Sequence, residues 1–162
     1  MKILVLLLSL SIMLCGCSSP TYETMGDVMH VGNPNALPQR IILDLPADAS
    51  VLTASGSDML YTCTDYTMCL QILPAGDISE TVRTLSGYDL SELTLMQTQC
   101  NDHARYDWVW VAAGENGDVL CRGAILDDGN FHYTLNVFAN AEEAGGVTQT
   151  WNALFQSFCL NT

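Results

Sequence analysis

Residues 106–139 read YDWVWVAAGENGDVLCRGAILDDGNFHYTLNVFA, and this stretch decides the fold of the chain. Its apolar runs at 106–112, 119–126 and 131–139 are separated by the polar turn sequences GENG and DDGN. An Asp-Gly pair between alternating apolar runs is a strong signal of a β-hairpin. The stretch therefore predicts three consecutive antiparallel strands, and a run at 93–100 extends this meander to four.

The turn lengths predict which residues face each other in the meander. We take the first turn as residues 114–117 and the second as Asp128-Gly129. The expected cross-strand pairs are Trp110 with Cys121, Trp108 with Gly123, Leu126 with Phe131 and Ile125 with His132. Because side chains alternate along a strand, this register sorts the meander into two faces.

The two faces differ in composition. One is apolar and is expected to be core; it carries Val109, Val111, Leu120, Ala124, Leu126, Phe131, Tyr133, Leu135 and Val137. The other is aromatic on one side and polar on the other; it carries Tyr106, Trp108, Trp110, Cys121, Gly123, Ile125, His132, Thr134, Asn136 and Phe138. A sheet with two such faces needs cover on both sides.

Two amphipathic helices flank the meander and supply that cover. The first begins at Asp77, which is followed three residues later by Glu80, and it ends at Gly87. Its apolar positions are Ile78, Val82 and Leu85. The second begins at a capping box of Asn140 and Glu143. Its apolar face consists of Val147, Trp151, Leu154, Phe155 and Phe158.

Upstream of the first helix, residues 40–45 are typical of a strand ended by Pro46, and residues 59–64 and 68–73 are typical of a hairpin. We therefore predict an α+β fold, a mainly antiparallel sheet flanked by two amphipathic helices. It forms a single domain over residues 40–162.

This order of elements, with Trp151-x-x-Leu154-Phe155-x-Ser157-Phe158 in the last helix, resembles the PsbP/Mog1-like family of α/β/α sandwiches. That resemblance implies a mostly non-enzymatic superfamily, and no catalytic set carries over. In detail the chain resembles small lipoproteins of anaerobic Gram-positive bacteria. The shared segments are TYETMGDV at residues 21–28 and LDDGN at residues 126–130. This second resemblance implies no known activity.

The first 16 residues have the layout of a secretory signal peptide, with Lys2 ahead of an apolar stretch at 3–14. The sequence Leu14-Cys15-Gly16-Cys17 that ends it resembles a bacterial lipobox. The resemblance implies cleavage before Cys17 and a diacylglyceryl thioether on that residue. Ordinary secretion with a free Cys17 is the alternative. Several acyl chains bind a bilayer firmly, because each buried methylene contributes about 0.8 kcal/mol.

We therefore expect a lipid-anchored protein on the outer face of the cell membrane, with residues 17–39 as a tether. That segment contains three prolines and no sustained helical or strand pattern. The expected partners are the membrane through diacylglyceryl-Cys17, the lipoprotein-processing enzymes, and an extracytoplasmic protein or small ligand.

Charge excludes one class of partner. The 162-residue chain has 18 acidic and five basic residues, a formal net charge of -13. Without Lys2 of the leader, four arginines stand against 18 acidic residues, a net charge of -14. Affinity for nucleic acid depends on cationic side chains, so nucleic-acid binding is excluded. A composition of 49% hydrophobic and 14% charged residues excludes intrinsic disorder.

Five of the seven cysteines remain in the domain once Cys15 and Cys17 are set aside. A three-residue loop at 65–67 would place Cys63 and Cys69 directly opposite each other. They then form a disulfide or remain two small buried residues. No spacing typical of metal ligands occurs, so we expect neither a metal nor a cofactor.

Tyr106, Trp108, Trp110 and His132 are the candidate ligand-binding residues. Three aromatic side chains on one sheet face could line a pocket for a sugar, a peptide or an apolar small molecule. The alternative is that the helix at Asp77 or the tether covers them as a second core. His132 is either a hydrogen-bonded structural residue or the base of a hydrolase.

No nucleophile motif such as G-x-S-x-G occurs, so no catalytic residue is assigned. The sequence favours a non-catalytic binding or accessory module outside the cell. The alternatives are a cell-envelope hydrolase that uses His132 and a purely structural envelope component.

Overall fold

The structure is a computed structural model that describes residues 32, 33 and 35–161. The predicted signal peptide, Cys17 and most of the predicted tether lie outside the described residues. The strands are β1 (Ile41–Ile42), β2 (Ser50–Ser55), β3 (Asp58–Thr62), β4 (Thr67–Pro74), β5 (Met96–Cys100), β6 (His103–Gly114), β7 (Gly117–Asp127), β8 (Phe131–Asn140) and β9 (Cys159–Leu160). The helices are α2 (Ile78–Ser86), α3 (Thr148–Ser157) and two short 3-10 helices, η1 (Leu90–Glu92) and η2 (Ala144–Gly146).

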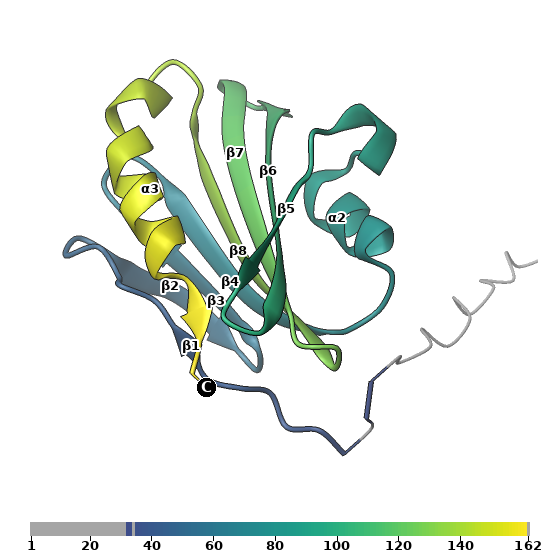
Figure 1. Cartoon of the computed structure of the whole chain (residues 1–162). Helices are drawn as coiled ribbons and strands as arrows, with labels where there is room; N and C mark the ends of the chain where they lie inside the picture. Colours follow the sequence, from purple (N-terminus) through teal and green to yellow (C-terminus); the bar gives the residue numbers. More distant parts are fainter. Residues whose placement is uncertain (1–31, 34, 162) are drawn as a thin grey trace, which may run out of the picture.

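Seven strands form one antiparallel sheet in the order β2-β3-β4-β8-β7-β6-β5. Strands β5 to β8 are neighbours in chain order, which confirms the predicted meander, and β4 pairs with the free edge of β8. Helix α3 lies on one side of the sheet and α2 on the other (Figure 1). The predicted α+β fold, a mainly antiparallel sheet flanked by two helices, is confirmed. No helix within the described ranges is long and apolar enough to cross a lipid bilayer.

The first hairpin of the meander has the predicted register, and the second does not. The pairs Trp110 with Cys121 and Trp108 with Gly123 are confirmed. In the second hairpin, Leu126 opposes Tyr133 and Ile125 opposes Thr134, two residues away from the predicted partners. The carboxylate of Asp128 accepts hydrogen bonds from the backbone N–H groups of Asn130 (2.8 Å) and Phe131 (2.7 Å), which stabilises a longer turn. A shift of two residues leaves both faces unchanged.

Helix α2 begins and ends where the sequence predicts. The side chain of Asp77 accepts a hydrogen bond from the backbone N–H of Ser79 at 2.7 Å. Gly87 has a φ of 80°, and its N–H donates to the carbonyl of Arg83, which closes the helix. Val82, at the centre of the apolar stripe, is fully buried.

Helix α3 begins at Thr148, later than the predicted capping box at Asn140 and Glu143. The side chain of Asn140 instead accepts a hydrogen bond from the N–H of Glu142 at 2.9 Å, which forms a turn. The following Gly145-Gly146 pair lies in η2, because glycine disfavours the α-helix. The predicted apolar face is nevertheless correct. Val147, Trp151, Leu154, Phe155 and Phe158 are all buried.

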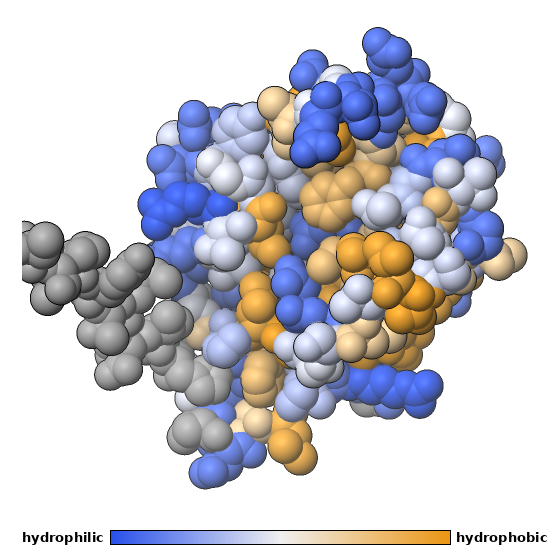
Figure 2. All heavy atoms as spheres, turned by 180° about the vertical axis from the view of Figure 1, so that it is seen from behind, coloured by the Kyte–Doolittle hydropathy of each residue, from blue (hydrophilic) through white to orange (hydrophobic). Residues whose placement is uncertain are grey.

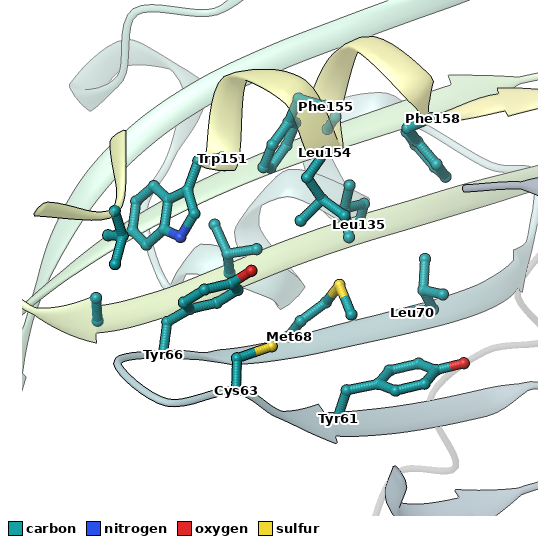
Figure 3. Packing of buried hydrophobic residues seen from close by; sticks show 14 of the residues in the cluster. Tyr61, Cys63, Tyr66, Met68, Leu70, Leu135, Trp151, Leu154, Phe155 and Phe158 are labelled. Carbon is teal, nitrogen blue, oxygen red and sulfur yellow. The ribbon is translucent and has the colours of Figure 1, made fainter. Parts of the chain in front are cut away.

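The main core lies between α3 and the sheet. Figure 3 shows Leu154 and Phe155 of α3 above Met68 and Leu135 of the sheet. Val109 and Val111 were predicted to belong to this core, but they are 54% and 46% exposed. A helix is only about 10 Å wide, whereas strands are spaced about 4.8 Å apart. One helix therefore cannot cover all seven strands, and part of β6 stays open.

Three short segments complete the fold. The predicted strand at 40–45 is reduced to β1, which pairs with the unpredicted strand β9. The unpredicted strand β2 forms the edge of the sheet beside β3, and all six of its residues are exposed. The end of the predicted tether contacts the domain, because the N–H of Gln39 donates to the hydroxyl of Tyr133 at 2.8 Å. Domain contacts therefore begin before Arg40.

Candidate functional site

The predicted aromatic face is buried beneath α2. Trp108 and Trp110 are stacked, with ring centroids 5.8 Å apart, and they are only 2% and 5% exposed. They form a second core with Val82, Cys121 and Ile125, and the partly buried Tyr106 packs against it. This arrangement favours the alternative in which the helix at Asp77 covers the aromatic side chains, so they do not line an open pocket on this face.

His132 connects α2 to the sheet. Its Nδ1 atom lies 2.9 Å from the hydroxyl oxygen of Thr81, and its Nε2 atom lies 3.8 Å from a carboxylate oxygen of Asp127. Burial lowers the pKa of His132, an effect that the negative charges of Asp127 and Asp128 oppose only in part. A general base must reach its substrate, and His132 is 1% exposed. The geometry therefore favours the structural role of this histidine.

Cys63 and Cys69 are free thiols, and the register predicted for them is wrong. The N–H of Cys63 donates to the carbonyl of Tyr66 at 2.9 Å, so the turn is two residues long and lies at Thr64-Asp65. Cys69 opposes Leu60 instead of Cys63. Cys63 belongs to the main core under α3, whereas Cys69 pairs with a residue of the α2 face, Asn136. Side chains on opposite faces of a sheet cannot form the predicted disulfide.

An open groove lies on the α3 face of the sheet, where β6 is left uncovered. Its volume is about 410 Å³. The lining residues are Thr94, Met96, Asp107, Trp108, Val109, Leu120, Arg122, Thr148 and Trp151. We call this site the Val109 groove. Strands β6 and β7 form its floor, the start of α3 forms one wall, and the segment leading into β5 forms the other. Val109 and Met96 are 54% and 56% exposed, so the groove presents apolar side chains to solvent.

Three charged residues lie beside this apolar surface. The Nε and Nη2 atoms of Arg105 donate to the two carboxylate oxygens of Asp107 at 2.7 and 2.9 Å. Both carboxylate oxygens of Asp107 are therefore engaged by one guanidinium. The Nη2 atom of Arg122 is 3.9 Å from Asp107, which is too long for a direct hydrogen bond.

Arg122 is held in place by α3. Its Nη1 atom donates to the side-chain oxygen of Asn152 at 2.9 Å, and its guanidinium carbon lies 4.1 Å from the ring centroid of Phe155. Burial lowers the pKa of Arg122, and the nearby charge of Asp107 offsets this effect only in part. Arginine remains protonated in proteins, so the groove has a fixed positive charge at its floor.

The sequence contains a signal for this site that the face assignment left out. Asp107 and Arg122 lie two residues from Val109 and Ala124 along their strands, so they occupy the face that is expected to be apolar. Charged residues are seldom buried unless they are paired or functional. Two opposite charges on one core face therefore indicate an ion pair at the edge of that core.

Other surfaces offer less defined sites. A hollow of about 510 Å³ at the end of the sheet is lined largely by polar residues of the turns at 63–66 and 114–117. Seen from behind, hydrophobic residues lie in separate clusters within a largely hydrophilic surface (Figure 2). No group of three or more His, Cys, Asp or Glu residues in the described part of the chain is arranged to hold a metal ion.

Comparison with known proteins identifies the fold. No protein-family model matches the chain, and no curated protein sequence matches it. The chain is similar to the solved structure of LpqN of Mycobacterium tuberculosis, which is involved in cell envelope biogenesis. The TM-score is 0.53 at 14% identity, over 81% of this chain and 87% of LpqN.

Two further solved structures are similar to the chain. CyanoP, the cyanobacterial PsbP of Synechocystis, gives a TM-score of 0.55 at 11% identity, over 80% of this chain and 96% of CyanoP. The Ran-binding protein Mog1p of Saccharomyces cerevisiae gives 0.49 at 13% identity, over 74% of this chain and 89% of Mog1p. At these identities the similarity concerns the fold alone. The similarity to CyanoP supports the PsbP-like arrangement of strands and helices that the sequence predicts.

Proposed function

We propose that the protein is a lipoprotein, anchored to the outer face of the cell membrane through Cys17, that acts as a non-catalytic binding or accessory module. The observation that carries the binding role is the Val109 groove. Small-molecule sites are clefts of roughly 300–1,000 Å³ with mainly apolar walls and a few placed polar groups. The groove has this size, and exposed apolar residues in it adjoin the charges of Asp107 and Arg122.

The chemistry of the groove favours binding over catalysis. Its ionisable residues are Asp107, whose carboxylate is engaged by Arg105, and Arg122, which holds its proton. Neither group is suited to accept a proton or to attack a substrate. A hydrolase based on His132 would need α2 to move away, because that histidine is 1% exposed and lies against Thr81 of α2.

The anchor can be tested in a bacterium that processes lipoproteins. We expect the full chain to incorporate labelled palmitate and to start at a modified Cys17 in intact-mass measurements. Cys17→Ser should remain an unlabelled precursor, whereas Cys15→Ser, two residues earlier, should still be labelled and cleaved. A wild-type chain that keeps Met1 or carries no lipid would refute the anchored location.

The binding role can be tested with the neutral apolar dye Nile red. Both hydrophobic cores lie within residues 40–161, so we expect the chain 17–162 with Cys17→Ser to fold without the leader or detergent. We expect its groove to bind the dye with an increase in fluorescence. Val109→Asn should abolish that signal, whereas Val51→Asn, at an equally exposed valine in β2, should keep it. Equal signals from the two variants would argue against the groove.

A further inference from the structure

We infer that the Val109 groove takes a small amphiphile with an apolar body and a single carboxylate, which pairs with Arg122. This inference rests on the proposed binding function and specifies the chemical class of the ligand.

Arg122 is a largely buried cation that shares its counter-ion, Asp107, with Arg105. Its side chain is 23% exposed, and Asp107 is the one described carboxylate with which it forms an ion pair, at 3.9 Å. Arg105 already holds both oxygens of Asp107 in a bidentate arrangement. The three side chains together carry a charge of +1. Because an uncompensated charge is costly in a partly buried site, a carboxylate from a ligand would be stabilised here.

The donors of Arg122 suit a carboxylate. A guanidinium has five N–H donors in one plane, and a single described side-chain acceptor, Asn152, receives one of them at 2.9 Å. The ring of Phe155 contacts the guanidinium as an aromatic surface, 4.1 Å from its carbon to the ring centroid, and takes none of its N–H groups as a hydrogen-bond acceptor atom would. Arginine binds a carboxylate through two parallel hydrogen bonds, which fixes the orientation of the bound group.

The walls of the groove determine the rest of the ligand. Val109 stands directly opposite Arg122 in the pairing of β6 with β7. Met96 and Leu120 extend the apolar surface on either side of Val109. A body of alkyl or aromatic carbon would bury these side chains and so remove apolar surface from water, which favours binding. The net charge of -13 repels ligands with several negative charges, so we expect the ligand to carry a single carboxylate.

The experiment compares three eight-carbon probes by isothermal titration calorimetry on the mature chain 17–162 with Cys17→Ser. The probes are octanoate, 1-octanol and octylammonium. A charge-assisted hydrogen bond contributes about 1.5–3 kcal/mol, so octanoate should bind about tenfold or more tightly than octanol. Octylammonium should bind more weakly than either. If octanol binds as tightly as octanoate, the groove still binds apolar molecules, but the inferred carboxylate is refuted.

Variants at Val109 and Arg122 test whether the preference for octanoate over octanol arises in the Val109 groove. Val109→Glu places a carboxylate opposite Arg122 and should abolish the preference for octanoate over octanol, whereas Val51→Glu, which adds the same charge at an equally exposed valine outside the groove, should keep it. Arg122→Gln should also abolish the preference, and Arg83→Gln, at an exposed arginine of α2, should not.

Stability gives a readout that is independent of any probe. At low salt, Val109→Glu should unfold at a higher urea concentration than Val109→Gln, because its carboxylate can pair with Arg122 more closely than Asp107 does at 3.9 Å. This comparison remains informative even if Arg122→Gln does not fold, since Val109 is an exposed position. Equal midpoints for the two Val109 variants, or no binding of octanoate, would overturn the inference.

Discussion

The indole of Trp108 lies directly over Gly123 on the neighbouring strand. A Cβ atom at Gly123 would be 2.4 Å from Cζ2 of Trp108, which is closer than two carbon atoms can approach. The two residues oppose each other in the pairing of β6 with β7. Gly123 is required here because the ring fills the space of a side chain, and not because of its backbone conformation.

This contact predicts that Gly123→Ala destabilises the domain. The added methyl group would displace a ring that is buried beneath α2, and overpacking of this kind costs about 1–3 kcal/mol. Gly76→Ala is the matched control, because no atom lies within 4 Å of a Cβ at that position. Urea unfolding followed by circular dichroism should show a lower midpoint for Gly123→Ala alone. Equal midpoints would mean that the second core is loosely packed.

The hydrogen bond between Thr81 and His132 predicts a difference between two threonines of α2. Thr81→Val leaves Nδ1 of a buried imidazole without its partner at 2.9 Å, and an unsatisfied buried polar group costs about 1–3 kcal/mol. Thr84 is exposed, and its hydroxyl bonds only to the backbone of its own helix. Thr84→Val should therefore change the free energy of unfolding by less than 0.5 kcal/mol, roughly the range for surface substitutions. If both variants lose the same free energy of unfolding, the hydrogen bond between Thr81 and His132 does not stabilise the packing of α2 on the sheet.

The low pKa of His132 predicts that stability falls in mild acid. Burial keeps its pKa below the usual 6.5 in the folded state. Below about pH 6.5 the unfolded chain therefore binds a proton that the folded protein does not, so the free energy of unfolding decreases as the pH falls. Neutral His132 makes its full contribution to the free energy of unfolding above pH 6.5. This contribution is lost as the pH falls from 6.5 to the pKa of His132 in the folded protein.

Urea titrations at pH 7.5 and 5.5 test this prediction. The wild-type protein should have a lower free energy of unfolding at pH 5.5 than at pH 7.5. The difference between these two free energies should be smaller for His132→Gln. Asp48, Asp77 and Asp128, whose pKa values are also lowered, titrate in a more acidic range and do not interfere. A wild-type protein with the same stability at both pH values would contradict the prediction.

The elements could be predicted from sequence because their signals are local. The turn at residues 114–117 sets the register of β6 with β7, and the spacing of Val82 and its neighbours defines the buried stripe of α2. The register after β7 was missed because it depends on how the side chain of Asp128 bonds within the turn. Strand β2 was missed because an exposed edge strand leaves no alternation of apolar residues.

The groove could not be predicted in the same way, because it depends on how far one helix reaches. Val109, Arg122 and Val137 lie in one row across β6, β7 and β8. Val137 is fully buried, whereas Val109 is 54% exposed. Both are valines at core-facing positions, so only the placement of α3 distinguishes them. The sequence predicts a candidate site at Trp108 and Trp110 because aromatic residues suit ligands and cores equally well.

Cys121 provides a test of whether α2 stays closed over the second core. Its side chain is fully buried, and burial raises the pKa of the thiol to about 11. Because the thiolate is the reactive form, the reactive fraction at pH 8 is roughly a hundredfold below that of an ordinary thiol. Iodoacetamide should therefore modify Cys69, which is half-buried, well before Cys121, as read by peptide mass spectrometry. In urea both should react. Rapid modification of native Cys121 would show that α2 opens, and an opened α2 would also expose His132 and restore the hydrolase hypothesis.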